Sequence, residues 1–214
     1  MEEFQALIDI LNRLLGPDGC PWDREQTLKS MRHSLIEEAH EVIDAVDAED
    51  SEAMKEELGD LLFLSLFLCK LAKKEGHFSL QDVLKTSADK LIRRHPHIFG
   101  DNKLENSEDV LKQWNEIKRN EKKYTDKKSL LDNIPKNLPT LLRAQKIIKN
   151  ATGKSFLTNK KIIPQNEEEK AGEQIWNLVE EISKKGIQAE IALRSWLVHV
   201  EKEFREREQA NDSN

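Results

Sequence analysis

Apolar residues recur every three or four positions through the first part of the chain, and this spacing limits it to helical folds. Stripes of this kind cover residues 4–15, 28–46 and 51–73, as in amphipathic helices that bury one face. A fourth precedes Pro96, and it begins at Ser79 and Asp82, which have capping-box spacing. Its apolar residues, expected to face inward, are Leu80, Val83, Leu84, Leu91 and Ile92. The sequence therefore predicts an all-α chain that begins with a four-helix bundle.

Weaker periodic patterns follow in the rest of the chain. They predict helices near residues 110–117, 141–149, 168–185 and 188–209. No segment combines strand-like alternation with a hairpin turn signal. Residues 118–129 are densely charged, which is typical of a solvated linker. We therefore predict two domains, 1–122 and 123–214, of which the second is the smaller.

Composition excludes several classes of protein. Lys and Arg number 34 against 40 Asp and Glu, so the net charge of -6 provides no basic field for bulk nucleic acid binding. The longest apolar run, residues 61–69, is about half the length that a membrane span needs. Two cysteines and an acidic, amphipathic start without a signal-peptide pattern predict a cytoplasmic protein.

Two acidic clusters stand at helical spacing on the predicted second and third helices. Their members are Glu37, Glu38 and Glu41 in the first, and Glu56, Glu57 and Asp60 in the second. Each cluster falls within an arc of about 100°. Because a short connection makes the two helices antiparallel neighbours, the acidic faces can meet. Carboxylates held close together repel one another unless a cation neutralises them, and oxygen ligands favour a hard ion such as Mg²⁺.

Other interpretations of these acidic residues remain open. Either cluster alone is typical of a solvated helix face, and Arg32 and Lys55 could form a salt-bridge network with them. Glu37-x-x-His40 fits the signature of ferritin-like metal sites, but the second copy that such a site requires is absent. We expect His40 to lie beside the acidic arc rather than to bind metal.

The motifs E-E-x-x-E at residues 37–41 and E-x-x-D at residues 57–60 resemble the MazG family of all-α nucleoside triphosphate pyrophosphohydrolases. The resemblance extends to GCPWDREQT, EELGDLLF, DKLIRRHPHIFGD and LPTLLRAQKI, and indicates a two-domain member with a degenerate second half. It implies Mg²⁺-dependent hydrolysis of an NTP or dNTP to the monophosphate and pyrophosphate. It also implies a homodimer.

The resemblance assigns roles to particular residues. The metal ligands would be Glu38, Glu41, Glu57 and Asp60. Glu37 would act as a base or support a ligand, which makes Glu37, Glu38 and Glu41 the catalytic candidates. In QWNEIK, Trp114 could stack on a base and Lys118 could reach a phosphate, although an ordinary buried Trp fits nearly as well. We expect Asp23 to cap the second helix and Trp22 to pack.

Basic residues near the end of the fourth helix provide a candidate phosphate site. Lys90, Arg93 and Arg94 share one helix face at spacings of three and four residues. Such a face can grip phosphate oxygens, and arginine can do so with two parallel hydrogen bonds. A solvated basic face is the competing interpretation.

The second half departs from the family pattern. If it is an internal repeat, Lys170 replaces Glu57, Glu173 replaces Asp60 and His199 stands opposite Lys90. The second half contains no E-E-x-x-E motif before these positions. We therefore expect catalysis in the first half and assembly or regulation in the second. The alternative is a non-catalytic nucleotide-binding sensor or helical interaction module.

Overall fold

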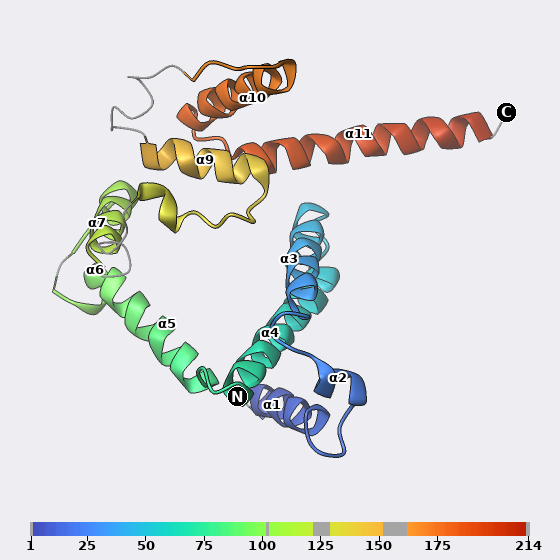
Figure 1. The fold of residues 1–214 in the computed structure, drawn as a ribbon, viewed down its shortest axis with the longest axis vertical. Helices are drawn as coiled ribbons and strands as arrows, with labels where there is room; N and C mark the ends of the chain where they lie inside the picture. The colour runs from blue at the N-terminus through green and yellow to red at the C-terminus, as the bar shows by residue number, and fades with distance from the viewer. Residues whose placement is uncertain (1, 102, 122–128, 152–161, 213–214) are drawn as a thin grey trace. The chain divides into compact units, whose positions relative to one another are not determined.

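The computed structural model describes residues 2–101, 103–121, 129–151 and 162–212, and all regular secondary structure in these ranges is helical. The elements are α1 (Glu2–Leu14), α2 (Pro21–Glu25), α3 (Arg32–Asp47), α4 (Ser51–Lys74), α5 (Leu80–Arg94), α6 (Pro96–Phe99), α7 (Ser107–Asn120), the 3-10 helix η1 (Leu130–Asn133), α9 (Thr140–Ala151), α10 (Glu167–Lys184) and α11 (Ala189–Asp212) (Figure 1). The predicted all-α class is confirmed. None of the described helices is long and apolar enough to span a membrane.

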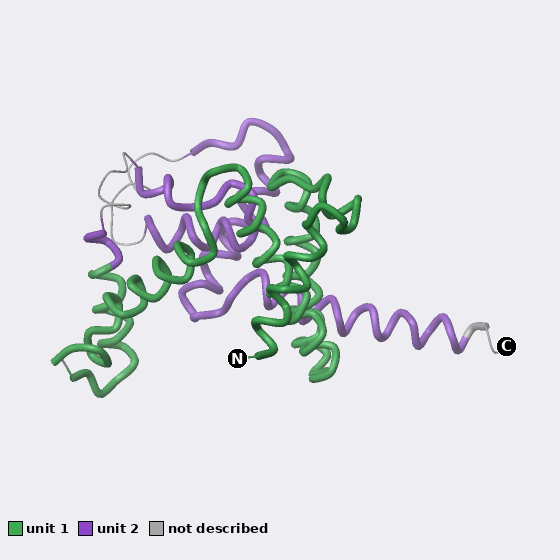
Figure 2. Tube along the Cα trace, turned by 90° about the horizontal axis from the view of Figure 1, so that it is seen from below, with its two compact units in different colours: residues 1–117 green, residues 118–214 purple. Residues whose placement is uncertain are grey.

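The chain divides into two compact units, residues 1–117 (unit 1) and 118–214 (unit 2) (Figure 2). This division falls inside α7, a few residues before the boundary that we predict between residues 122 and 123. Most of the charged linker, residues 122–128, lies outside the described residues, as do residues 152–161 of the second half. The exact domain boundary stays a prediction.

Unit 1 is built on a helical hairpin in which α3 and α4 pack along each other. The second half of α4 and the neighbouring α1 form the core, whose buried members are Leu11, Met31, Leu64, Leu66, Phe67 and Leu71. Asp50 caps α4, because its carboxylate accepts hydrogen bonds at 3.0 Å from the backbone N–H groups of Glu52 and Ala53. The hairpin thus places the first half of α4 beside α3 and outside the core.

Helix α5 begins as predicted but is not covered as predicted. Ser79 and Asp82 form the capping box, and Leu80 packs against the core. However, Val83, Leu84, Leu91 and Ile92 are 38% to 53% exposed, so the expectation that they face inward is wrong. The reason is that α5 diverges from α4 after its first turns, and no other helix of unit 1 covers this face (Figure 1).

The segment before α3 also differs from the expectation. Residues 21–25 form α2, with Pro21 in its first turn, so Asp23 lies inside this helix instead of capping α3. Helix α3 starts after Met31 without a side-chain cap. Trp22 is 60% exposed and therefore does not pack as predicted.

Unit 2 has a smaller core formed where α9, α10 and α11 meet. Ile148, Val179 and Ala189 are its buried apolar residues. Gln145 of α9 links the three helices, since its amide donates to Ser183 Oγ and the Ile187 carbonyl at 2.8 Å each. Its carbonyl oxygen accepts from the Ala189 N–H at 2.7 Å. One side chain therefore fixes the start of α11 against α9 and α10.

Candidate functional site

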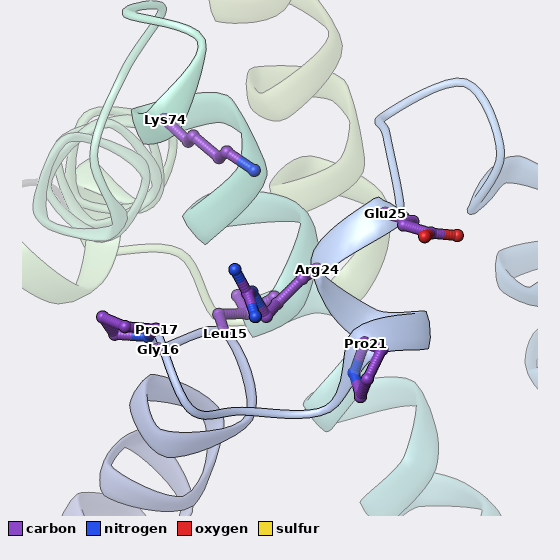
Figure 3. Close-up of a pocket in the computed structure, with 7 residues that line it drawn as sticks. All are labelled: Leu15, Gly16, Pro17, Pro21, Arg24, Glu25 and Lys74. Atoms are coloured by element: carbon purple, nitrogen blue, oxygen red, sulfur yellow. The ribbon is translucent and has the colours of Figure 1, made fainter.

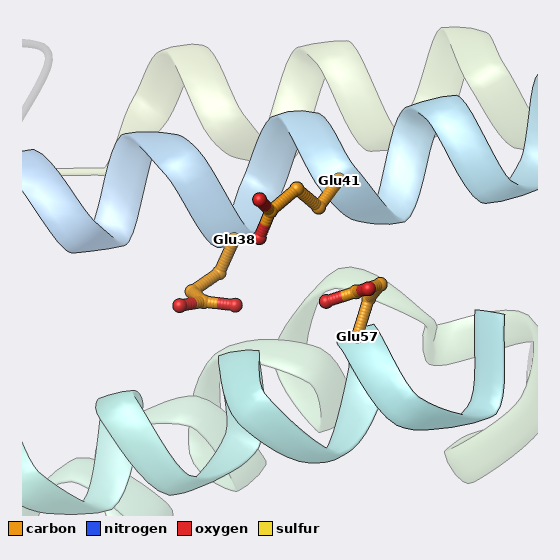
Figure 4. Close-up of side chains that lie close together, drawn as sticks. All are labelled: Glu38, Glu41 and Glu57. Atoms are coloured by element: carbon orange, nitrogen blue, oxygen red, sulfur yellow. The ribbon is translucent and has the colours of Figure 1, made fainter. Parts of the chain in front are cut away.

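Three carboxylates converge between α3 and α4. Glu38 and Glu41 extend from α3 toward α4, and Glu57 extends from α4 toward them (Figure 4). One oxygen of each lies within 4.8 Å of the others. The helical hairpin produces this meeting, because residues at i and i+3 on one helix face the same strip of an antiparallel neighbour. The predicted meeting of the two acidic faces is therefore present.

Electrostatic repulsion within this group changes its acidity. Partial burial raises the pKa of Glu38 above its ordinary value, and the charges of Glu41, Asp60, Glu57 and Glu37 raise it further. Partial burial also raises the pKa of Glu57, to which the charges of Glu41, Glu56 and Asp60 add. Protons are therefore held more tightly here than on isolated carboxylates. A bound cation would offset the unfavourable free energy of the charged carboxylates in the same way.

The proposed counter-charges do not neutralise this group. Lys55 pairs with Glu52, and the Arg32 guanidinium donates to the Lys29 carbonyl at 3.0 Å. Within the described residues, neither cation forms an ion pair with the converging carboxylates, which argues against the salt-bridge network. The donor set consists of carboxylate oxygens alone, and such a set fits a hard divalent cation.

The other acidic candidates lie around the three. Asp60 is exposed one turn after Glu57, and its charge acts on both Glu38 and Glu57, although it is outside the group of three. Glu37 is exposed and contacts His33, whose Nδ1 lies 2.8 Å from the Glu37 carboxylate. Sequence reasoning missed His33, although its spacing of four residues from Glu37 was a visible signal.

His40 does not belong to the group either. It is exposed on α3 and is not among the converging ligands. The expectation that it does not bind metal stays a prediction.

The basic residues of α5 have different environments. Lys90 is half-buried and Arg93 is exposed, whereas Arg94 is 9% exposed. The Arg94 guanidinium carbon lies 5.2 Å from the centre of the Trp114 ring. The His95 ring approaches the same tryptophan edge-on, at 4.9 Å between centroids. Arg94 is thus held in a cation–π contact, and Lys90 and Arg93 are the more accessible of the three.

These contacts attach α7 to the end of α5. Besides Trp114, Gln113 takes part, since its side-chain oxygen lies 3.3 Å from Nδ1 of His97. Lys118 follows Trp114 by four residues on α7 and is half-buried. Binding of a nucleotide by Trp114 and Lys118 stays a prediction, and a base would have to share the tryptophan with Arg94. The roles of His95 and His97 were missed because they stood only inside a longer motif.

A separate pocket of about 590 Å³ lies where α1 and α4 end. Its lining residues are Leu15, Gly16, Pro17, Pro21, Arg24, Glu25 and Lys74, and Arg24 and Lys74 point into it while Glu25 points away (Figure 3). Both cations stand beside the carbonyl ends of helices, which are partially negative. Their position is explained by that local charge, and none of the predicted site residues lines this pocket.

Unit 2 does not reproduce the acidic site. Lys170 pairs with Glu167 at 2.6 Å, Glu173 is exposed, and His199 stacks edge-on with Trp196 at 6.4 Å between ring centroids. No group of three or more potential metal ligands occurs among the described residues of this unit. The absence of a metal site from the second half stays a prediction.

Comparisons with known proteins find similarity to one family. The model of the MazG nucleotide pyrophosphohydrolase domain matches residues 26–99. The chain is 44% identical over 157 residues to a nucleoside triphosphate pyrophosphohydrolase of Escherichia coli K12, covering 73% of this chain and 60% of that protein. It is 42% identical over 153 residues to the "Nucleoside triphosphate pyrophosphohydrolase/pyrophosphatase MazG" of Thermotoga maritima, covering 72% and 58%.

The matches span only about three fifths of the length of these relatives. A solved structure of a mazG-related protein from Thermotoga maritima is also similar, with a TM-score of 0.48 and 28% identity over 54% of this chain and 98% of that one. The region matched by the family model contains the converging carboxylates and all of α5. Residues 26–99 are therefore similar to the MazG nucleotide pyrophosphohydrolase domain.

Proposed function

We propose that the first domain, residues 1–122, hydrolyses nucleoside triphosphates, either NTP or dNTP, to the monophosphate and pyrophosphate. The convergence of Glu38, Glu41 and Glu57 from two helices carries this proposal. The activity for which two relatives are named, at 44% and 42% identity with the chain, supports it. Such an enzyme would clear the cytoplasmic nucleotide pool.

Mg²⁺ is the proposed cofactor, held by Glu38, Glu41, Glu57 and Asp60. The fit rests on the donor chemistry, because carboxylate oxygens with raised affinity for protons are suited to a hard divalent ion. When bound, the ion would offset the triphosphate charge and make a coordinated water more acidic. Asp60 lies one turn from Glu57, which places its carboxylate on the same side of α4.

The remaining residues would bind the substrate and move a proton. Lys90 and Arg93, accessible on one face of α5, would hold phosphate oxygens. Arg94, stacked on Trp114, would keep α7 in place beside them. Glu37 is our candidate to accept the proton of the attacking water, and its contact with His33 orients its carboxylate. The scissile bond would be the one between the α phosphorus and the oxygen bridging to the β phosphorus.

Two further parts of the proposal concern assembly. The exposed apolar face of α5 supports a homodimer, because apolar residues 38% to 53% exposed on a helix of unit 1 are stabilised when a second copy covers them. The second domain, residues 123–214, would serve assembly or regulation, since no metal-ligating group occurs among its described residues.

The test is a panel of NTPs and dNTPs incubated with the purified chain, with and without Mg²⁺. We expect Mg²⁺-dependent release of pyrophosphate and monophosphate in equal amounts. Release of orthophosphate alone would contradict the assigned bond. Nucleotide binding by equilibrium dialysis without any release would replace the enzyme with a nucleotide sensor.

A further inference from the structure

Most of α11 is unpacked within unit 2. The helix has 24 residues, and its start is fixed by the buried Ala189 and by Glu190, whose carboxylate accepts from the Leu142 N–H at 3.3 Å. Beyond this anchor it extends away from α9 and α10 (Figure 1). Every described side chain from Ser195 to Ala210 is exposed. Packing of an apolar face usually stabilises a helix in water, so this segment requires a partner.

The free part of α11 carries an apolar stripe. Its members are Leu193, Trp196, Leu197, Val200 and Phe204, which are 45% to 64% exposed. At 100° per residue they fall within an arc of about 100°. Spacings of three and four residues along a narrow arc are those of the seam between two helices in a coiled coil.

The order of spacings makes this stripe complementary to itself. From Leu193 the steps to Leu197, Val200 and Phe204 are four, three and four residues, a sequence that is identical when taken from the other end. In an antiparallel pair of identical helices, Leu193 therefore faces Phe204 of the second copy while Leu197 faces Val200. A larger side chain then meets a smaller one at each outer position, which favours close packing.

The charges beside the stripe permit this pairing. Glu201 pairs with Arg205 at 3.4 Å along one flank. Glu203, on the other flank, pairs with Arg207, which continues the line of the stripe one turn beyond Phe204. Both signs are thus present beside the stripe, so two copies meet without net repulsion. We propose that α11 of one chain packs antiparallel against α11 of a second copy through the Leu193–Phe204 stripe. The proposal rests on the homodimer of the proposed function and adds its contact surface.

Disulfide trapping in the full chain tests this contact. One chain carries Leu197→Cys and a second carries Val200→Cys. The two variants are mixed and mildly oxidised, and covalent dimers are measured on a non-reducing gel. Lys202→Cys, which lies about 200° from Val200 around the helix, is the matched control. The unsubstituted chain, with Cys20 and Cys69, gives the baseline. Because a disulfide requires close Cα atoms, we expect about tenfold more dimer from the mixture than from the control.

Equal trapping at the stripe and at Lys202→Cys, or no trapping above baseline, would overturn the proposal. Bonds from the stripe to Cys20 or Cys69 of the same chain would also overturn it, since the chain would then cover its own stripe. Sedimentation separates this result from the proposed dimer. A dimer that forms without trapping refutes only the α11 contact, whereas a monomer with an unchanged helical circular dichroism spectrum refutes both.

Discussion

The α3–α4 hairpin and α10 are both rich in acidic residues, but the surroundings of their carboxylates shift the pKa values in opposite directions. On the hairpin, Glu38 and Glu57 face other carboxylates, and both have raised pKa values. On α10, Glu181 pairs with Lys185 at 2.7 Å, and its hydrogen bond to that lysine lowers the pKa of the carboxyl group. The same residue type therefore binds protons tightly in one unit and weakly in the other.

The difference separates carboxylates that are already paired from carboxylates that are arranged to bind a cation. A carboxylate paired four residues along its own helix is already satisfied, and such exposed pairs add little to stability. Carboxylates that converge from two helices would be satisfied by a cation from outside. Acidic composition alone does not separate the two cases, whereas the placement of lysine does.

The strongest way to break this contrast is to remove one carboxylate from each region. Glu38→Gln should lower turnover of the preferred nucleotide by more than about a hundredfold, because a charged metal ligand is lost. Glu181→Gln, the matched change on α10, should leave turnover within about twofold. Pyrophosphate release measures both, with circular dichroism as the folding control. Similar rates for the two variants would refute the metal assignment.

Metal-dependent stability should follow the raised pKa values. Since the folded chain holds protons on Glu38 and Glu57 more tightly than the unfolded chain does, stability of the metal-free protein should fall as pH rises above about 4.5. Bound Mg²⁺ would stabilise the charged carboxylates against both burial and mutual repulsion, and so would offset this fall. At a concentration about a hundred times its Kd, it should raise the Tm by about 5–10 °C at pH 7.5.

At pH 4.5 protons compete with the metal, so the increase in Tm should be smaller. Differential scanning fluorimetry in EDTA and in Mg²⁺ measures the effect, with Glu38→Gln as the control. An equal increase at both pH values, or in the variant, would place metal binding elsewhere.

Gln145 sharpens the comparison by testing how the three helices of unit 2 are held together. Gln145→Leu removes the hydrogen bonds to Ser183, Ile187 and Ala189. Leaving half-buried polar partners unsatisfied should lower the free energy of unfolding by about 1–3 kcal/mol. Gln174→Leu, at an exposed position of α10, should change it by less than about 0.5 kcal/mol. Urea unfolding compares them, and equal losses would contradict the role given to Gln145.

The smallest effect concerns the ion pair on α10. Lys185→Met removes the partner of Glu181, so the pKa of Glu181 should rise while the stability of the chain stays unchanged within error. A carboxyl NMR titration follows the pKa, and urea unfolding follows stability. A clear loss of stability would show that α10 depends on its ion pairs more than exposed pairs normally allow.

Sequence patterns predicted where the helices lie along the chain better than they predicted which helix faces are buried. The periodicity and the Ser79–Asp82 capping box located α5, because both signals lie within a few neighbouring residues. They did not reveal that Leu84 and Leu91 lack a cover within unit 1, since burial depends on where α5 travels relative to α4. The prediction that Trp22 packs was wrong for the same reason, because a hydrophobic residue type does not specify which residues lie next to it.

The site was predictable to the extent that it depends on spacing. Glu38, Glu41 and Glu57 converge because helical geometry and a short connection suffice to bring them together. The stack of Arg94 on Trp114 depends on the path of α6 and the loop after it, which no periodicity encodes. Spacing on α5 therefore predicted that Arg94 shares a face with Lys90 and Arg93, but it did not predict that Arg94 is buried.

Helix α4 has a mechanical consequence for the site. Its buried residues all lie from Leu64 onward, whereas Glu57 stands about 10 Å nearer the N-terminal end. The carboxylate end of α4 therefore lies beside α3 and outside the core of unit 1. A divalent ion bound between α3 and α4 would restrict the motion of both helices. Slower amide hydrogen exchange around residues 48–57 would report that restriction.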